Sequence, residues 1–398
     1  MVPKGWKEGV IEDIAKVSSG GTPSRNEENY WSNGNIPWIR TTEVQNCVLN
    51  YEDTQEFITR EGLEGSSAKL VPSGTLLMAM IGQGKTRGQV ALLNFEATTN
   101  QNCATILLTK NNSPEFYFNY LLSKYERIRN WSNSAGQSNL SGALVKAIPI
   151  LIPPLPEQQK IAKILSTWDK AISTTERLIE NSTQQKKALM QQLLTGKKRL
   201  LNDEGKRFAG EWEDIKLSEI AQITMGSSPK SDAYNEIGDG LPLLQGNADI
   251  KNRKSVPRIY TAQITKECQI GDILFSVRAP VGTVALSNHH ACIGRGIAAI
   301  KAKKSQSQDY LYQWLLSFES KWERYSQGST FEAVNSNDIK SLNLSIPNFK
   351  EQQKIATVLT NADKEIELLK QQLADLQQEK KALMQVLLMG KKRVKLND

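Results

Sequence analysis

Two long stretches of the chain place apolar residues at alternating spacings of four and three. In the first stretch these seam positions are Ile161, Leu165, Trp168, Ile172, Thr175, Ile179, Ser182, Lys186, Leu189 and Leu193. In the second they are Ile355, Leu359, Ala362, Ile366, Leu369, Leu373, Leu376, Lys380, Leu383 and Leu387. Five such heptads are typical of a coiled-coil seam. We therefore predict two helices, each spanning about 57 Å at roughly 1.5 Å per residue.

Local signals set the limits of both helices. Pro156 suits a first helical turn, where its missing N–H costs nothing. Asn348 and Glu351 have the spacing of a capping box. Gly196 and Gly390 stand where the helices would end, with Lys and Arg beside them near the negative end of the helix dipole.

The two stretches are copies of one sequence. Residues 152–200 align without gaps onto residues 346–394, and 25 of the 49 positions are identical. Both copies contain EQQKIA, KKALMQ and GKKR. A fainter likeness upstream pairs Gly88-Gln-Val-Ala-Leu92 with Gly282-Thr-Val-Ala-Leu286. The chain is therefore a tandem duplication, in which the helical parts stay similar while the other parts have diverged.

The duplication predicts the fold class and the domains. We expect an α+β protein with pseudo-two-fold symmetry: two mixed α/β domains separated by a pair of long antiparallel coiled-coil helices. The predicted segments are a first domain at 1–151, a helix and linker at 152–203, a second domain at 204–345 and a helix at 346–398.

Within the two domains, short apolar runs alternate with Gly, Pro, Asn and Ser. Runs such as 74–80 and 271–277 predict strands. One helix is expected in each domain, at 114–130 and at 308–324. Ten seam residues are predicted to form the helix or partner interface: Ile161, Leu165, Trp168, Ile172, Ile355, Leu359, Ile366, Leu369, Leu373 and Leu376. Lys186 and Lys380 interrupt both seams at the same position, which suggests that they fix the register or face a partner helix.

The loops carry hydrogen-bonding side chains of the kind that contact DNA bases and phosphates. The formal charge of +8 agrees with a nucleic-acid partner, although many proteins are mildly basic. For each single residue a solvated loop is the competing interpretation. The candidate DNA contacts are Arg25, Lys85, Arg87, Gln101, Asn102, Gln137, Lys230, Gln245, Asn247, Arg278, Arg295 and Ser329.

Composition indicates a cytoplasmic protein. No apolar run reaches the roughly 18 residues that a membrane helix needs, and the first residues lack a signal-peptide core. The four cysteines do not have zinc-site spacing, so buried thiols are expected, and the adjacent His289 and His290 suit a polar loop. We expect no metal and no cofactor in this chain.

Two catalytic interpretations compete with DNA recognition. Residues 79–86 fit a relaxed P-loop pattern, but a strand-like run follows Lys85 where a P-loop requires a helix. The Asn- or Asp-Pro-Pro-aromatic signature of methyl transfer is absent, because Ile152 precedes Pro153-Pro154. A coiled-coil scaffold with non-specific DNA binding is the remaining alternative.

The duplicated IP…EQQKIA…KKALMQ…GKKR stretches, together with the phrase that begins at Arg207-Phe208-Ala209-Gly210, resemble the specificity subunits of type I restriction-modification enzymes. The resemblance covers essentially the whole chain. It implies a non-catalytic subunit in which each variable domain recognises one half of a bipartite, asymmetric site in double-stranded DNA. It also implies that the helices set the spacing and bind two DNA methyltransferase subunits. Restriction subunits would then join the assembly, and S-adenosylmethionine, ATP and Mg²⁺ would act only in these partners.

Overall fold

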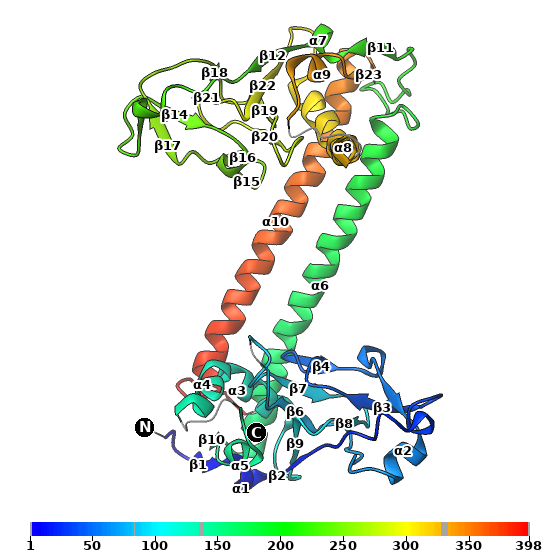
Figure 1. Cartoon of the computed structure of the whole chain (residues 1–398), viewed down its shortest axis with the longest axis vertical. Helices are drawn as coiled ribbons and strands as arrows, with labels where there is room; N and C mark the ends of the chain where they lie inside the picture. Colours follow the sequence, from blue (N-terminus) through cyan, green and yellow to red (C-terminus); the bar gives the residue numbers. More distant parts are fainter. Residues whose placement is uncertain (1, 83, 135–138, 328–332, 397–398) are drawn as a thin grey trace. The chain divides into compact units, whose positions relative to one another are not determined.

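The computed structural model describes residues 2–82, 84–134, 139–327 and 333–396 (Figure 1). Two of the predicted DNA contacts, Gln137 and Ser329, lie outside the described residues.

The chain forms two compact units, and the boundary between them falls inside the two long helices. Unit 1 contains Met1–Thr175 and Gln372–Asp398, and unit 2 contains Glu176–Gln371. The division predicted from the sequence, in which each helix forms a segment of its own, stays a prediction. Each unit holds one mixed α/β domain, so the expected tandem α+β architecture is present.

Unit 1 is built on two sheets and a separate strand pair (Figure 1). The five-stranded sheet has the order β2 (Ala15–Ser19), β9 (Cys103–Leu108), β6 (Leu76–Ala79), β7 (Val90–Leu93) and β4 (Cys47–Leu49). The three-stranded sheet has the order β5 (Phe57–Ile58), β3 (Ile36–Ile39) and β8 (Thr98–Thr99), and β1 (Lys7–Val10) pairs with β10 (Pro149–Ile152). The helices are α1 (Ile11–Ile14), α2 (Arg60–Glu64), α3 (Pro114–Ser123), α4 (Tyr125–Ser134) and α5 (Gly142–Lys146), with 3-10 turns η1 (Glu28–Tyr30) and η2 (Tyr51–Asp53).

Unit 2 repeats this plan with more strands. Its six-stranded sheet has the order β12 (Ala221–Met225), β22 (Ile297–Ala302), β19 (Ile273–Ser276), β20 (Val284–Leu286), β16 (Lys254–Ser255) and β15 (Ile250–Lys251). The second sheet has the order β13 (Tyr234–Asn235), β17 (Ile259–Thr261), β14 (Leu241–Leu244), β21 (Ala291–Ile293) and β18 (Glu267–Cys268), and β11 (Glu213–Lys216) pairs with β23 (Asn343–Ile346). The helices are α7 (Leu217–Ile220), α8 (Gln308–Gln327) and α9 (Ser336–Lys340), with 3-10 turns η3 (Ser231–Ala233) and η4 (Asn247–Asp249).

The continuous apolar runs are strands, as predicted, and they are buried on both faces. In β6, Leu76 and Met78 join a cluster that includes α3 and the long helices, whereas Leu77 and Ala79 join a second cluster on the other face. This alternation follows from the two-residue period of a strand. The sheet is therefore the middle layer of the domain.

The single helix predicted at 114–130 is wrong, because α3 and α4 are separate helices that meet at Lys124. The N–H of Lys124 donates to the carbonyl oxygens of Leu121 and Leu122, which tightens the turn and ends α3. In unit 2 the matching segment stays one helix, α8, as expected.

The long helices α6 (Leu155–Leu193) and α10 (Phe349–Leu387) each contain 39 residues. All twenty predicted seam positions are buried or half-buried, including the polar Thr175, Ser182, Lys186 and Lys380. Beyond the helices, Gly196 and Gly390 have φ angles of 69° and 64°, which favour glycine. Asn348 caps α10 by accepting the N–H of Glu351 on its Oδ1 at 3.1 Å.

Segments of α6 and α10 pack against each other within each unit. In unit 1, Ile161 and Leu165 of α6 share a core with Met384 and Leu387 of α10. In unit 2, the other ends meet in the same way, and Leu193 packs with residues of the first turns of α10. The start of one helix thus lies beside the end of the other in both units.

The two seam lysines form equivalent ion pairs. In unit 2, Lys186 Nζ lies 2.5 Å from Asp363 Oδ1, and in unit 1 Lys380 Nζ lies 2.5 Å from Asp169 Oδ1. Each lysine therefore faces the other long helix, which agrees with the hypothesis that it helps to set the register.

The EQQKIA motif joins each domain to its helices. The carboxylate of Glu351, with a fully buried side chain, binds Arg199 through two contacts of 2.6 Å, and Glu157 binds Arg393 in the matching place. These hydrogen bonds raise the pKa of both arginine guanidinium groups. Gln158 completes the motif, because it accepts the N–H of Ser113 at the start of α3 and donates to the carbonyl oxygen of Pro153.

Replacing Arg199 with alanine is expected to destabilise unit 2, because the carboxylate of Glu351 would stay buried without its partner. Breaking a buried pair costs roughly 3 kcal/mol, which corresponds to a drop of about 6–12 °C in the thermal unfolding midpoint of a unit this size.

Lys354→Ala is the matched control, because Lys354 pairs with an Asp203 that is 96% exposed. Exposed pairs contribute at most about 1 kcal/mol, so this variant should unfold near the wild-type temperature. Equal unfolding midpoints for the two variants would contradict the structural role of the buried pair.

Candidate functional site

The strand order of unit 1 brings four polar loops to one end of its five-stranded sheet. Ser19 at the end of β2 pairs with Ala104 near the start of β9, and Ala79 at the end of β6 pairs with Cys103. The loop after β2, the β6–β7 loop and the β8–β9 loop therefore lie together. Asn100 donates its N–H to Ile39 O, which adds the loop after β3 to this end.

Unit 2 has the same arrangement. Met225 at the end of β12 pairs with Ala298, and Ser276 at the end of β19 pairs with Ile297. The N–H of Gly294 donates to Leu244 O at 2.8 Å, which brings the loop after β14 to the same place. We name each set of four loops the recognition end of its unit.

Close backbone packing fixes the first loop of each recognition end. A Cβ on Gly20 would lie 2.0 Å from Thr99 O, and a Cβ on Gly226 would lie 2.2 Å from Gly294 O. Only glycine permits this approach. The duplicated glycines therefore hold the loop after β2 or β12 against the loop before β9 or β22.

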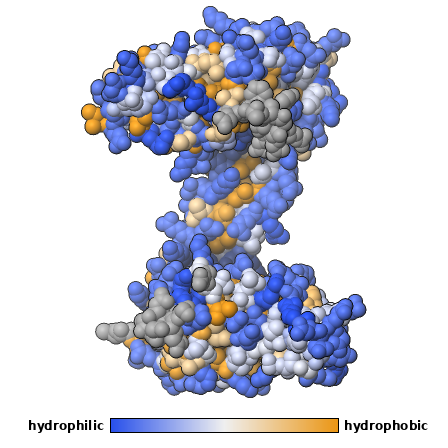
Figure 2. Space-filling view, viewed as in Figure 1, coloured by the Kyte–Doolittle hydropathy of each residue, from blue (hydrophilic) through white to orange (hydrophobic). Residues whose placement is uncertain are grey.

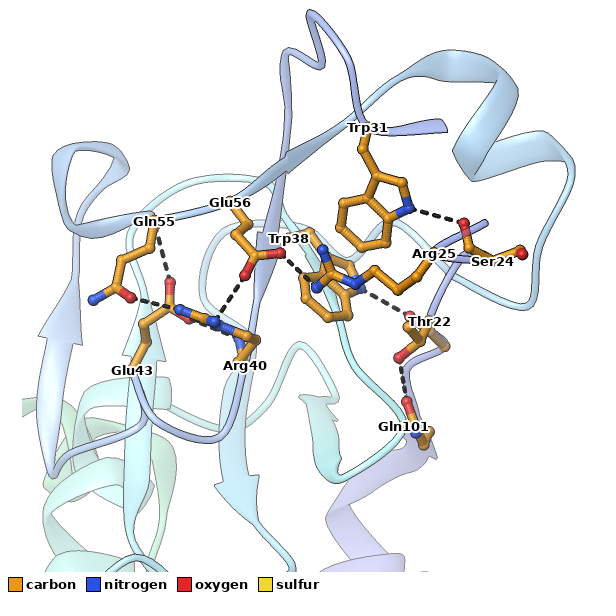
Figure 3. Close-up of polar contacts among 11 residues, drawn as sticks. Thr22, Ser24, Arg25, Trp31, Trp38, Arg40, Glu43, Gln55, Glu56 and Gln101 are labelled. Atoms are coloured by element: carbon orange, nitrogen blue, oxygen red, sulfur yellow. Dashed lines mark hydrogen bonds and ion pairs between the residues drawn. The ribbon is translucent and has the colours of Figure 1, made fainter. Parts of the chain in front are cut away.

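The described candidates of unit 1 all lie on these loops: Arg25, Lys85, Arg87, Gln101 and Asn102. Gln101 accepts a hydrogen bond from Thr22 Oγ1, which joins the β8–β9 loop to the loop after β2 (Figure 3). Lys85 and Gln101 are exposed, and Arg87 and Asn102 are half-buried.

The described candidates of unit 2 lie on the corresponding loops: Lys230, Gln245, Asn247, Arg278 and Arg295. Arg295 occupies the position that Gln101 has in unit 1, and its backbone N–H donates to Ser228 Oγ at 3.1 Å. Gln245 donates from its amide to the hydroxyl of Tyr234 at 2.9 Å.

Arg40 was not among the predicted contacts, although in unit 1 it occupies the position that Gln245 has in unit 2. Both residues directly follow a strand, and both donate a backbone N–H to a buried carboxylate, Glu43 at 2.9 Å and Asp249 at 2.7 Å respectively. A signal was present in the sequence, because Ile36-Pro37 matches Leu241-Pro242 and this match places position 40 opposite position 245. The same backbone turn therefore presents an arginine in one unit and a glutamine in the other.

Arg40 belongs to a network of charged and aromatic side chains (Figure 3). Its Nη1 lies 2.7 Å from Glu56 Oε1, and its Nη2 donates to Gln55 Oε1 at 2.5 Å. Glu56 Oε2 also accepts a 2.6 Å hydrogen bond from Arg25 Nη2. One carboxylate thus holds two guanidinium groups at the recognition end.

The P-loop interpretation is not supported, because β7 follows the loop of Lys85 where nucleotide binding would require a helix. Among the described residues, no cluster of His, Cys, Asp and Glu could hold a metal ion. The four cysteines are free thiols, and burial raises the pKa of the Cys103 and Cys268 thiols. None of the described helices has the length and apolar character that crossing a membrane requires.

Comparison with known proteins identifies the family. The type I restriction modification DNA specificity domain matches residues 3–182 and again residues 209–378. A specificity subunit assigned to the type I restriction enzyme MjaX of Methanocaldococcus jannaschii is 31% identical over 410 residues, which cover 99% of this chain and 95% of that protein. Since the domain matches most of the chain, the protein belongs to the type I restriction-modification DNA specificity family and carries its domain twice.

Solved structures agree on the fold. A chain from a structural study of complex assembly and conformational transition in a type I R-M system superposes with a TM-score of 0.64 at 24% identity. It covers 98% of this chain and 100% of its own length. The HsdS subunit from Thermoanaerobacter tengcongensis superposes with a TM-score of 0.54 at 23% identity, and 98% of each chain is covered.

The glycine contacts predict the effect of adding one methyl group in unit 2. Gly226→Ala should destabilise the unit by about 1–3 kcal/mol, because its Cβ would overlap the carbonyl oxygens of Gly294 and Ile297. Gly246→Ala is the matched control, because no heavy atom lies within 4 Å of its Cβ and its φ of 176° suits any residue. Thermal unfolding should separate the two variants, and a normal midpoint for Gly226→Ala would refute the tight packing.

Proposed function

We propose that this chain reads DNA sequence, with each recognition end contacting one half of a bipartite, asymmetric site in double-stranded DNA. The observation that carries the proposal is the duplication of one loop framework with different side chains. Gln101 stands where unit 2 has Arg295, and Arg40, whose side chain holds Glu56, stands where unit 2 has Gln245. Arginine and glutamine pair with different bases, so the two half-sites should differ in sequence.

The long helices have the features of an antiparallel coiled coil that sets the distance between the two half-sites. This proposal is supported by the pairing of opposite helix ends within each unit and by the equivalent pairs Lys186–Asp363 and Lys380–Asp169. Major-groove sites about one turn apart, roughly 34–36 Å, would suit such a spacer.

Catalysis belongs to partner subunits in this proposal. The chain acts in the cytoplasm without a cofactor of its own, while two methyltransferase subunits use S-adenosylmethionine and restriction subunits use ATP and Mg²⁺.

Leu178 and Leu368 of unit 2 lie outside the seam and are 46% and 70% exposed. Figure 2 shows apolar side chains among the mainly hydrophilic ones along the viewed face of the helices. In this proposal such residues contribute to the surface that a partner subunit contacts.

An exchange of one domain tests the assignment of the half-sites. Replacing residues 1–151 with the corresponding domain of a relative should change one half of the methylated sequence and leave the other half and the spacing intact. Sequencing the methylated positions of DNA exposed to the assembled complex gives the readout. A methylated sequence that stays the same, or that changes in both halves, would contradict the assignment.

Shortening both helices tests the spacer. Removing four residues from the middle of each helix takes away about 6 Å at 1.5 Å per residue. The gap between the half-sites should then shrink by roughly one or two base pairs, because B-DNA rises 3.4 Å per pair. Removing four residues from the loop 203–206 is the control and should leave the gap unchanged. An unaltered gap in the shortened protein would refute the spacer role.

A further inference from the structure

We propose that Arg25 recognises a guanine in the half-site of unit 1, and that Glu56 and Arg40 are positioning residues that hold it in place. This inference rests on the proposed function and adds the base class and the roles of individual side chains. The juxtaposition that carries it is the Glu56 carboxylate between two guanidinium groups at the recognition end.

One side of the Arg25 guanidinium contacts the protein, and the other side is exposed to solvent. Its guanidinium carbon lies 3.6 Å from the ring centroid of Trp31 and 5.0 Å from that of Trp38, and its Nη2 donates to Glu56. The side chain is still 52% exposed. In the described part of the chain Glu56 is its one ion-pair partner, so most of the five N–H donors of the guanidinium face no protein acceptor.

The aromatic support for Arg25 is itself fixed. The indole N–H of Trp31 donates to Ser24 O, and that of Trp38 donates to Gly21 O, both at 2.9 Å. The two indole rings meet edge to face with centroids 5.0 Å apart. Stacking on a rigid ring reduces the rotamer freedom that Arg25 would lose on binding.

Arg40 differs from Arg25 because its nitrogen atoms are already occupied. Nε faces Glu43 at 3.4 Å, Nη1 faces Glu56 and Nη2 faces Gln55. Glu43 is anchored in turn, since its side chain is 3% exposed and accepts the N–H groups of Arg40 and Gln55. Arg40 therefore fixes Glu56, and Glu56 fixes Arg25.

The charge of the cluster favours a base over a phosphate. Two positive groups, Arg25 and Arg40, face two negative groups, Glu43 and Glu56, so the net charge is zero. A phosphate approaching Arg25 would meet the Glu56 carboxylate, which repels it. A guanine edge carries no formal charge and offers the acceptors O6 and N7, which match two N–H groups of one guanidinium.

Selecting bound sequences from random DNA tests whether Arg25 contacts a base or a phosphate. The full-length chain, assembled with the modification subunits of its own system, would be used to select binding sites from a random pool of double-stranded DNA. The sequences that the wild-type complex selects should share one G·C pair, and the sequences that the Arg25→Lys complex selects should no longer share it. Lysine keeps the positive charge but lacks the bidentate fork of arginine. Discrimination at that pair should fall on the order of ten- to hundredfold, with an unchanged salt dependence of binding.

Lys85→Ala is the contrasting variant, because Lys85 is exposed in the β6–β7 loop. It should weaken binding to all sequences alike and reduce the salt slope by about 1, as expected of a phosphate contact. Glu56→Gln should reduce the discrimination at the same G·C pair as Arg25→Lys does. It should also strengthen non-specific binding and steepen the salt dependence, because it uncovers a positive charge.

The guanine assignment is overturned if Arg25→Lys recovers the wild-type sequence with full discrimination at every position. It is also overturned if Arg25→Ala weakens all sequences equally and lowers the salt slope, which would indicate a phosphate contact. A wild-type complex that selects no sequence at all would instead refute the proposed function. Thermal unfolding of each variant identifies misfolded protein, and Glu56→Gln tests the same base pair independently of any substitution at Arg25.

Discussion

The structure depends on two buried carboxylates that each hold an arginine from the far end of the other repeat. Glu157 and Glu351 stand in the first turns of α6 and α10, and Arg393 and Arg199 follow the glycines that end α10 and α6. Burying a carboxylate is costly without a partner of opposite charge. Each unit therefore needs the end of one long helix to complete the start of the other.

This requirement explains why the helical parts stay alike while the domains diverge. Glu157 meets Arg393 and Trp6, whereas Glu351 meets Arg199. The glutamine that follows each glutamate accepts the N–H of the serine that precedes α3 or α8. These contacts use groups that every copy of the domain presents at the same place. The loops at the recognition ends make none of these contacts. Their side chains can therefore vary without weakening the packing between each domain and its helices.

Local patterns predicted the parts of the fold that local physics determines. The seam spacing gave both long helices, and glycines gave their ends, because helix periodicity and left-handed backbone conformation depend on neighbouring residues. The break between α3 and α4 was not predictable, since nothing at Lys124 differs in helix propensity from a residue within a helix. The cluster of Arg25, Arg40 and Glu56 also escaped prediction as a unit, because these residues come from three separate segments that only the sheets bring together.

The turn that begins at Arg40 and Gln245 has a consequence for how specificity evolves. In both units its conformation depends on a backbone N–H that donates to a buried acid, whether the first residue is arginine or glutamine. In unit 1 the side chain of Arg40 also holds Glu56, so a codon change at this position acts on its neighbours as well as on the side chain that it replaces. A single substitution can therefore alter a whole cluster at the recognition end while the backbone turn keeps its hydrogen bond.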